Sequence, residues 1–356
     1  MRPPTLRLSV LDQSTVVTGR SPPESIQETL TLARHCEALG YHRYWLAEHH
    51  NSASQAGTAP EVLMAAVAAT THRIRVGSAG VMLPHYSSLK VAEVFRVLEA
   101  IAPGRIDMGL GRAPGSDGLT AYALNPQADS AADHFPSAVR DLLAWVRGET
   151  LVEGHPFATV TAQPAGPTAP EPWILGSSEY GAQVAAYFGL PFCFASFITD
   201  GRGAAEALEV YRAGFRPGET LVRPQAAVAV WAMAADTEAE AARHFSSRAL
   251  WRLGRDKGVY AALPSPEEAA AYPYTDAERD RVAKIRAQAY AGQADRVVAA
   301  ISAMAAGLDV EEVIVLTTLH DPVVRRRSYA LLAEAAGRLA GKAAGGLARG
   351  ERLAAE

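Results

Sequence analysis

The amino-acid sequence predicts a (β/α)8 barrel. Eight short apolar segments alternate with segments of helical length and pattern. Such alternation is typical of parallel sheets, and eight repeats favour closure into a barrel over the alternative, an open doubly wound sheet. The strands are expected at residues 6–11, 43–47, 74–83, 106–110, 173–175, 192–197, 225–233 and 313–317.

The helices between these strands have recognisable first and last residues. Ser21 and Glu24 form a capping-box pattern, and that helix is expected to end at Gly40. Ser87 precedes a helix that Pro103 and Gly104 would stop. The other helices are expected at 60–72, 133–147 and 179–188, from Asp236-Thr237 to Leu253, and after Asp321-Pro322.

Three connections are too long for simple turns, namely 112–132 after the fourth strand, 148–172 before the fifth, and 255–292 after the helix that follows the seventh. Loops that follow barrel strands build active sites, so 112–132 is expected to form a wall of the site. Residues 255–292 are expected to be either a mobile lid or a solvated helical insertion. The barrel is expected to span 1–341 as one domain, with a frayed tail at 342–356.

Composition narrows the class of protein. The chain has 356 residues, of which 49% are hydrophobic and 20% charged, and its net charge is −4. This charge, without a basic stripe, argues against nucleic acid or a membrane as partner. The first residues lack a signal-peptide core, so a cytoplasmic location is expected. Cys36 and Cys193 are expected to be buried small side chains rather than a disulfide or metal site.

Glu48, His49 and His50 follow the second strand directly. Two histidines beside a carboxylate could bind a metal, act as general acid and base, or fill the end of a barrel. Adjacent residues of an extended chain point to opposite faces, so His49 and His50 do not easily bind one ion. No metal site is therefore predicted.

Two further strand ends are candidates for anion binding. Residues 108–115 are glycine-rich, but Pro114 and the lack of a following helix speak against a dinucleotide loop. Arg112 there could hold a phosphate or carboxylate, or merely form a salt bridge on the rim. Gly176, Ser177 and Ser178 open a helix, where free backbone N–H groups attract anions, although the serines could simply cap it. Together with Arg112, they favour a phosphate site.

Residues 76–84 contain small side chains at the end of the third strand. These would let a flat ligand approach the backbone, or they could allow tight packing between strands.

In this order and spacing, the sequence resembles the bacterial luciferase-like family of flavin-dependent oxidoreductases. The resemblance covers roughly residues 6–335. It is carried by five segments: Trp45-Leu-Ala-Glu-His-His-Asn51, Val76-Gly-Ser-Ala-Gly-Val-Met-Leu-Pro84, Gly104-Arg-Ile-Asp-Met-Gly-Leu-Gly-Arg112, Leu175-Gly-Ser-Ser178 and Gly189-Leu-Pro-Phe192.

The resemblance implies a (β/α)8 barrel with reduced FMN at its C-terminal mouth. It assigns Arg112, Ser177 and Ser178, with Gly176 beside them, to the flavin phosphate. It places Ser78 and Ala79 under the flavin ring, where the family often has a non-prolyl cis peptide. His49 matches the catalytic histidine, with Glu48 and His50 flanking it. Gly111 stands where luciferase itself has a cysteine, so light emission is not expected.

The function expected from this resemblance is a monooxygenase that uses reduced FMN and O2 on a small organic substrate. A separate flavin reductase is expected, because the sequence has no nicotinamide fingerprint. A deazaflavin-dependent dehydrogenase and a non-catalytic flavin-binding protein are the alternatives. A homodimer is expected through the helix that contains Ala65, Ala66, Ala68 and Ala69, as in the family, although these small side chains could instead face the sheet.

Overall fold

Eight parallel strands close into a barrel in the computed structural model, which describes residues 6–218 and 221–353, with side chains to residue 340. The ring runs β10-β1-β2-β3-β5-β6-β7-β8, and pairing of β8 with β10 closes it. The predicted (β/α)8 barrel is thus confirmed. The barrel strands are β1 Arg7–Asp12, β2 Arg43–Leu46, β3 Arg75–Ser78, β5 Ile106–Gly111, β6 Glu171–Gly176, β7 Phe192–Ala195, β8 Ala226–Ala235 and β10 Glu312–Leu316.

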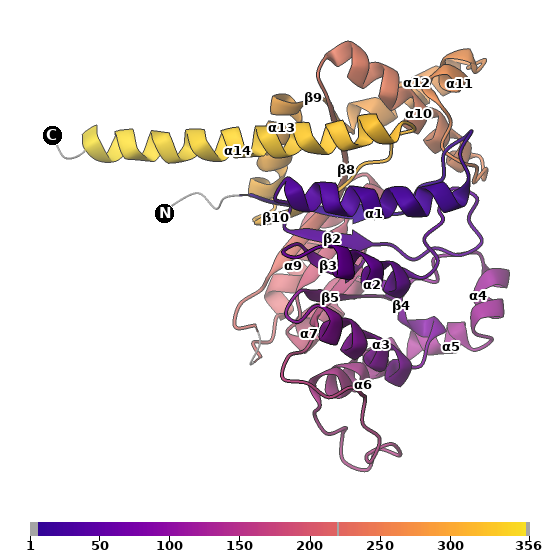
Figure 1. The fold of residues 1–356 in the computed structure, drawn as a ribbon, viewed down its shortest axis with the longest axis vertical. Coiled ribbons are helices and arrows are strands. Elements are labelled where there is room, and N and C mark those ends of the chain that lie inside the picture. Colours follow the sequence, from indigo (N-terminus) through magenta and orange to yellow (C-terminus); the bar gives the residue numbers. More distant parts are fainter. Residues whose placement is uncertain (1–5, 219–220, 354–356) are drawn as a thin grey trace.

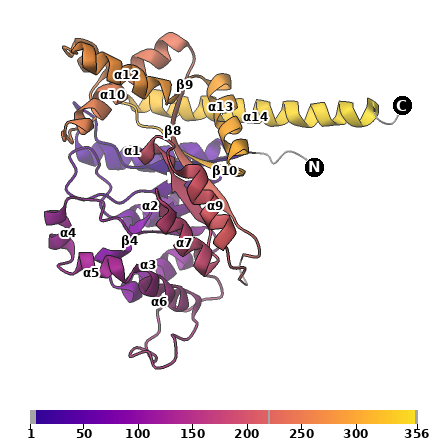
Figure 2. The same ribbon diagram turned by 180° about the vertical axis from the view of Figure 1, so that it is seen from behind.

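Helices surround this ring, as Figures 1 and 2 show from opposite sides. The start of β1 and the C-terminal end of α14 lie on one side of the barrel. On the other side lie α4 Gly118–Leu124, α5 Ala128–Asp133, α11 Pro266–Ala271 and α12 Asp276–Ala287. The larger helices are α1 Pro22–Ala38, α2 Pro60–Thr70, α3 Ser88–Ile101, α6 Phe135–Arg147, α7 Glu179–Phe188, α9 Ala204–Gly214, α10 Glu238–Asp256, α13 Ala294–Gly307 and α14 Pro322–Leu353.

Local sequence explains where these helices begin. Glu24 accepts the backbone N–H of Ser21 at 2.7 Å, so the predicted capping box is present at α1. The backbone N–H of Lys90 donates to Ser87, and Thr237 caps α10 in the same way. Asp321 accepts the backbone N–H of Val323 at the start of α14.

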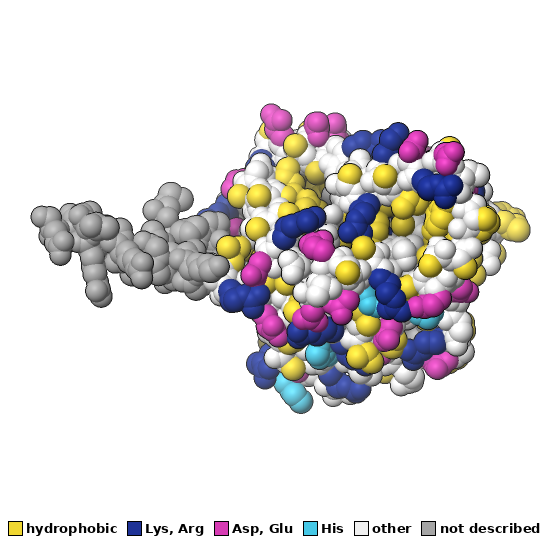
Figure 3. Space-filling view, turned by 90° about the horizontal axis from the view of Figure 1, so that it is seen from above, with side chains coloured by type: hydrophobic (Ala, Val, Ile, Leu, Met, Phe, Trp, Pro, Cys, Tyr) yellow, Lys and Arg dark blue, Asp and Glu magenta, His cyan; other side chains and the backbone are white. Residues whose placement is uncertain are grey.

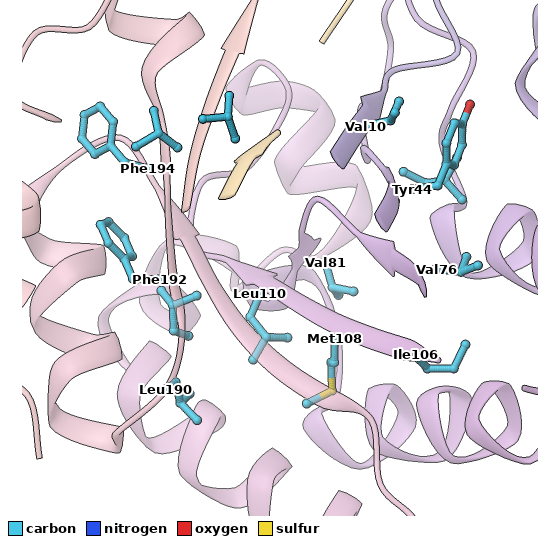
Figure 4. Packing of buried hydrophobic residues seen from close by; sticks show 14 of the residues in the cluster. Val10, Tyr44, Val76, Val81, Ile106, Met108, Leu110, Leu190, Phe192 and Phe194 are labelled. Atoms are coloured by element: carbon cyan, nitrogen blue, oxygen red, sulfur yellow. The ribbon is translucent and has the colours of Figure 1, made fainter. Parts of the chain in front are cut away.

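Alternating side chains of each strand enter two separate cores. Val10, Tyr44 and Phe192 point outward and pack with helix residues in the larger core (Figure 4). Leu11 and Trp45, which follow Val10 and Tyr44 in sequence, fill the barrel interior instead. Because successive side chains point to opposite faces, each strand contributes residues both to the layer between strands and helices and to the barrel interior. Cys36 and Cys193 are buried and free, as predicted.

The N-terminal end of the barrel interior is closed by charged side chains. Arg43, 3% exposed, contacts Asp107 at 2.9 Å, Glu312 at 3.0 Å and Glu171 at 3.3 Å. Its guanidinium also lies over the ring of Trp173. Burial alone would lower the pKa of Arg43, but these three carboxylates raise it above its usual value. A paired charge cluster therefore fills this end.

The structure differs from the predicted strands in two places. The third predicted strand, 74–83, is split into β3 and the short β4 Val81–Met82, with a cis peptide bond between Ala79 and Gly80. The sixth, 192–197, ends at Ala195, because the chain turns there into the short helix α8 Ser196–Thr199. Both differences lie at the C-terminal ends of strands.

The long connections contain structure of their own. Residues 112–132 include α4 Gly118–Leu124 and most of α5 Ala128–Asp133, whereas 149–170 contain neither helix nor strand. Residues 255–292 form α11 Pro266–Ala271, α12 Asp276–Ala287 and β9 Tyr290–Gln293, which pairs with β8. The last segment is thus a helical insertion, and its mobility stays a prediction. The predicted tail 342–356 lies within α14 as far as Leu353; its last three residues lie outside the described part, and its fraying stays a prediction.

The described helices include none with the length and hydropathy that crossing a membrane requires. On the face shown in Figure 3, Lys and Arg side chains are interspersed with Asp and Glu. This face has no broad patch of one charge.

Close packing between β3 and β5 generates a prediction about stability. A Cβ added to Gly109 would lie 2.0 Å from the carbonyl oxygen of Ser78, whereas one added to Gly111 on the same strand meets its nearest atom at 3.9 Å. We expect Gly109→Ala to lower the free energy of unfolding by about 1–3 kcal/mol or more, and Gly111→Ala to change it by less than about 0.5 kcal/mol. Urea denaturation of both variants measures this. Equal stability would contradict the tight strand contact.

Candidate active site

A cavity of about 690 Å³ opens at the C-terminal end of the barrel. Its volume lies in the usual range for small-molecule sites. Most of the residues predicted for the site line it: Glu48, His49, Ala79, Arg112, Gly176, Ser177 and Ser178. His50 and Ser78 are predicted residues that do not. These seven predicted residues therefore lie around one cavity, and their roles stay predictions.

Arg112, Ser177 and Ser178 form one wall, at the ends of the neighbouring strands β5 and β6. The guanidinium of Arg112 lies 4.1 Å from the ring centre of Tyr180 and has no carboxylate partner among the described residues. Ser178 is the residue before α7, yet its hydroxyl makes no capping hydrogen bond. A free guanidinium, a free hydroxyl and a helix N-terminus thus converge where an anion could bind.

His49 lies on a different wall, directly after β2. Burial, followed by the charges of Arg255 and His50, lowers its pKa to about 4, so the imidazole is neutral near pH 7. Its Nδ1 is enclosed and has no hydrogen-bond partner among the described residues. Gln55 Nε2, which can only donate, lies 3.5 Å from His49 Nε2. That contact favours the tautomer with the proton on Nδ1.

Glu48 has its carboxylate fully engaged within the protein. It accepts hydrogen bonds from Tyr86 Oη at 2.6 Å and from the backbone N–H of Met82 at 3.0 Å, and its Oε1 is 2.8 Å from His50 Nε2. Burial and Glu48 together raise the pKa of Tyr86. Glu48 therefore links the segments after β2 and β3, and His50 is held against it outside the cavity.

The small residues after β3 serve two purposes. Ser78 is fully buried, and its hydroxyl donates to the carbonyl of Gly109. A Cβ on Gly80 would lie 2.9 Å from the same carbonyl oxygen, so tight strand packing is present here. Ala79 and Gly80 nevertheless line the cavity, which leaves the wall flat and close to the backbone.

Sequence reasoning missed a row of arginines on α10. Arg248, Arg252 and Arg255 all line the cavity. Their spacing of four and three residues places them on one face of a helix. That spacing, on a helix following the seventh strand, was a signal that could have identified them.

The chain belongs to the luciferase-like monooxygenase family, whose model matches residues 6–312. It is 36% identical to the luciferase-like monooxygenase of Escherichia coli strain K12 over 92% of this chain and 96% of that one. It is 35% identical to the N-acetyl-S-alkylcysteine monooxygenase of Bacillus subtilis strain 168, over 93% of this chain and 98% of that protein.

A solved structure of apo-MsnO8 is 38% identical and covers 93% of this chain and 98% of its own, with a TM-score of 0.84. The barrel fold, the cavity at its C-terminal end and the relatives therefore all indicate the same class of protein. The protein is an oxidoreductase of the monooxygenase type.

The lowered pKa of His49 predicts a dependence of stability on pH. The unfolded imidazole has a pKa of about 6.5, so between that value and about 4 the unfolded state binds more protons than the folded state. The free energy of unfolding should therefore fall as the pH decreases from about 6.5 toward 4. We expect His49→Gln to remove about 2 kcal/mol of that fall between pH 7.5 and pH 5.

Urea denaturation at the two pH values measures this, with His72→Gln, on an exposed histidine, as the control. His42 and His244 also have lowered pKa values, so part of the fall should persist in every variant. An unchanged fall in His49→Gln would show that His49 can be protonated freely in the folded protein.

Proposed function

We propose that this protein is a flavin-dependent monooxygenase that uses reduced FMN and O2 to oxidise a small organic substrate. Support comes from its family and from the two named monooxygenases at 35% and 36% identity. The observation that carries the proposal is one cavity with a free anion site on one wall and a neutral, partly enclosed histidine on another. N-acetylated cysteine thioethers, the class named for the Bacillus subtilis relative, are the first substrates to test.

The residues of the first wall fit the phosphate of FMN. Arg112 has no carboxylate partner that a phosphate would need to displace, and the Ser178 hydroxyl and the N-terminus of α7 are available as donors. Ala79 and Gly80 provide a flat wall for the ring. Bound reduced FMN would supply the electrons with which O2 is activated.

The protein's own contribution is proton handling and exclusion of water. Because His49 is neutral near pH 7 and its contact with Gln55 favours a proton on Nδ1, it can donate a hydrogen bond from Nδ1, and its unprotonated Nε2 can accept a proton. Apolar side chains such as Leu11, Phe197 and Leu316 cover other parts of the cavity wall. We assign Glu48 a positioning role, because its carboxylate oxygens contact Tyr86, the backbone N–H of Met82 and His50.

Delivery of reduced FMN by a separate reductase and a cytoplasmic location remain part of the proposal. The decisive experiment is an anaerobic titration of the protein with FMN, reduced FMN and a deazaflavin, followed by admission of air with thioether substrates. We expect tight binding of reduced FMN and an oxygenated product. Binding of the deazaflavin alone would indicate a dehydrogenase, and flavin binding without turnover of any substrate would indicate a binding protein.

Single substitutions should separate flavin binding from turnover. We expect Arg112→Ala to weaken binding of reduced FMN about ten- to a hundredfold, as for a lost hydrogen bond to a charged group, and to abolish the preference for FMN over riboflavin. His49→Gln should retain binding and lose turnover. Isothermal titration and product analysis measure the two effects, with Arg34→Ala on the outer helix α1 as control. Equal loss of binding in both variants would show that these roles are misassigned.

The predicted homodimer has structural support in an apolar surface on α2 and α3, which pack side by side. Val62 is 63% exposed there, and Val97 and Ile101 are 48% and 46% exposed. Exposed apolar side chains on neighbouring helices can mark interaction surfaces. We therefore propose that two copies associate through this surface.

Light scattering after gel filtration tests this association. We expect the unaltered protein to have the mass of a dimer and Val62→Glu to shift it to a monomer, because a buried unpaired charge opposes association. Val323→Glu, at a valine of equal 63% exposure on α14, is the control and should remain dimeric. A monomeric unaltered protein would contradict the proposed dimer.

A further inference from the structure

Arg248 is a buried arginine without an ion-pair partner in the described part of the chain. It is 7% exposed and lines the cavity from α10. No acceptor among the described residues is hydrogen-bonded to its nitrogens, and its Nε is enclosed. Its guanidinium lies 4.0 Å from the ring centre of Trp231. Because burying an unpaired charge costs several kcal/mol, such a side chain is expected only where it has a task.

The other two arginines of the row differ in their partners. Arg252 forms an ion pair with Asp200, at 3.0 Å. Arg255 lies over the rings of Trp251 and Tyr260 and has no carboxylate within ion-pair distance in the described chain. Arg248 and Arg255 are therefore the two positive charges of this wall without a carboxylate of their own.

Among the described residues that line the cavity, no free carboxylate balances them. Glu48 is occupied by Tyr86, Met82 and His50. Asp256 forms an ion pair with Arg281 at 2.7 Å. Burial, then the charges of Arg252 and Arg255, depress the pKa of Arg248, and Asp200 opposes this only in part. The wall thus has an excess of positive charge.

The proposed donors for the flavin phosphate follow other strands than this arginine row. The phosphate donors follow β5 and β6, whereas α10 follows β8, and β7 lies between β6 and β8 in the ring. The charge of Arg255 also contributes to the lowered pKa of His49, which places the arginine row close to the residue assigned to proton handling. This is the part of the cavity where a substrate would meet that residue.

We propose that Arg248, together with Arg255, binds a carboxylate of the organic substrate, so that this monooxygenase acts on small organic acids. The guanidinium fork matches a carboxylate with two parallel hydrogen bonds, and the ring of Trp231 lies against the guanidinium. The inference rests on the proposed function, because it specifies the substrate of the same cavity.

The test compares acids with their neutral amides. The probes are phenylacetate, octanoate and N-acetyl-S-benzylcysteine, each beside its carboxamide, with binding measured by isothermal titration to the protein with and without FMN. We expect at least one acid to bind about tenfold or more tightly than its amide, as for a charge-assisted pair. Arg248→Met should remove this preference. Arg243→Gln, at an exposed arginine of the same helix, should keep it.

Arg248→Met should also fold, because replacing an uncompensated buried charge with an apolar side chain of similar length is neutral or stabilising. Its melting temperature should equal or exceed that of the unaltered protein. A marked fall in melting temperature would show a structural role and overturn the proposal. Equal binding of every acid and its amide would overturn it as well.

Two further outcomes separate this inference from the proposed function. If Arg248→Met loses the preference for FMN over riboflavin, Arg248 holds the flavin phosphate and the proposal is wrong. If reduced FMN fails to bind the unaltered protein, the proposed cofactor is wrong, and the comparison of acids with amides on flavin-free protein still decides the role of Arg248.

Discussion

The paired charges around Arg43 are the constraint on which the barrel depends. An eight-stranded ring encloses an interior that must be filled, and here one end is filled by Arg43 with Asp107, Glu312 and Glu171. These four residues come from four different strands, so the cluster joins strands that are distant in the sequence. Because this charge cluster fills the N-terminal end, only the C-terminal end has room for the cavity of the candidate active site.

The fold was largely predictable because buried parallel strands appear as short apolar runs and each is followed by a helix with its own start signal. Where the prediction was wrong, the cause lay in distant contacts. Residues 74–83 form one apolar run, and its interruption at Ala79 and Gly80 involves the carbonyl of Gly109, which comes from another strand. The helices within 112–132 are short, and their periodicity was too brief to detect.

The positions of the site residues were predictable in outline, because the ends of parallel strands meet at one end of a barrel. Their orientation was not. That His49 lines the cavity while His50 does not is determined by Glu48, whose partners Tyr86 and Met82 come from a later segment of the chain. Likewise, the exposure of Arg112 and the burial of Arg248 depend on tertiary neighbours. Sequence identifies such residues as candidates, and packing assigns their roles.

The insertion after α10 is attached to the barrel at several points. Leu263 pairs with Val17 after β1, Thr18 donates to Glu268, and β9 continues the edge of β8. Tyr260 thus belongs to a unit that adjoins the mouth beside the arginine row of α10, without contributing to the charge cluster around Arg43. Substitutions in this unit can therefore change which molecules enter the cavity. The strands and the charge cluster around Arg43, on which folding depends, can stay unchanged.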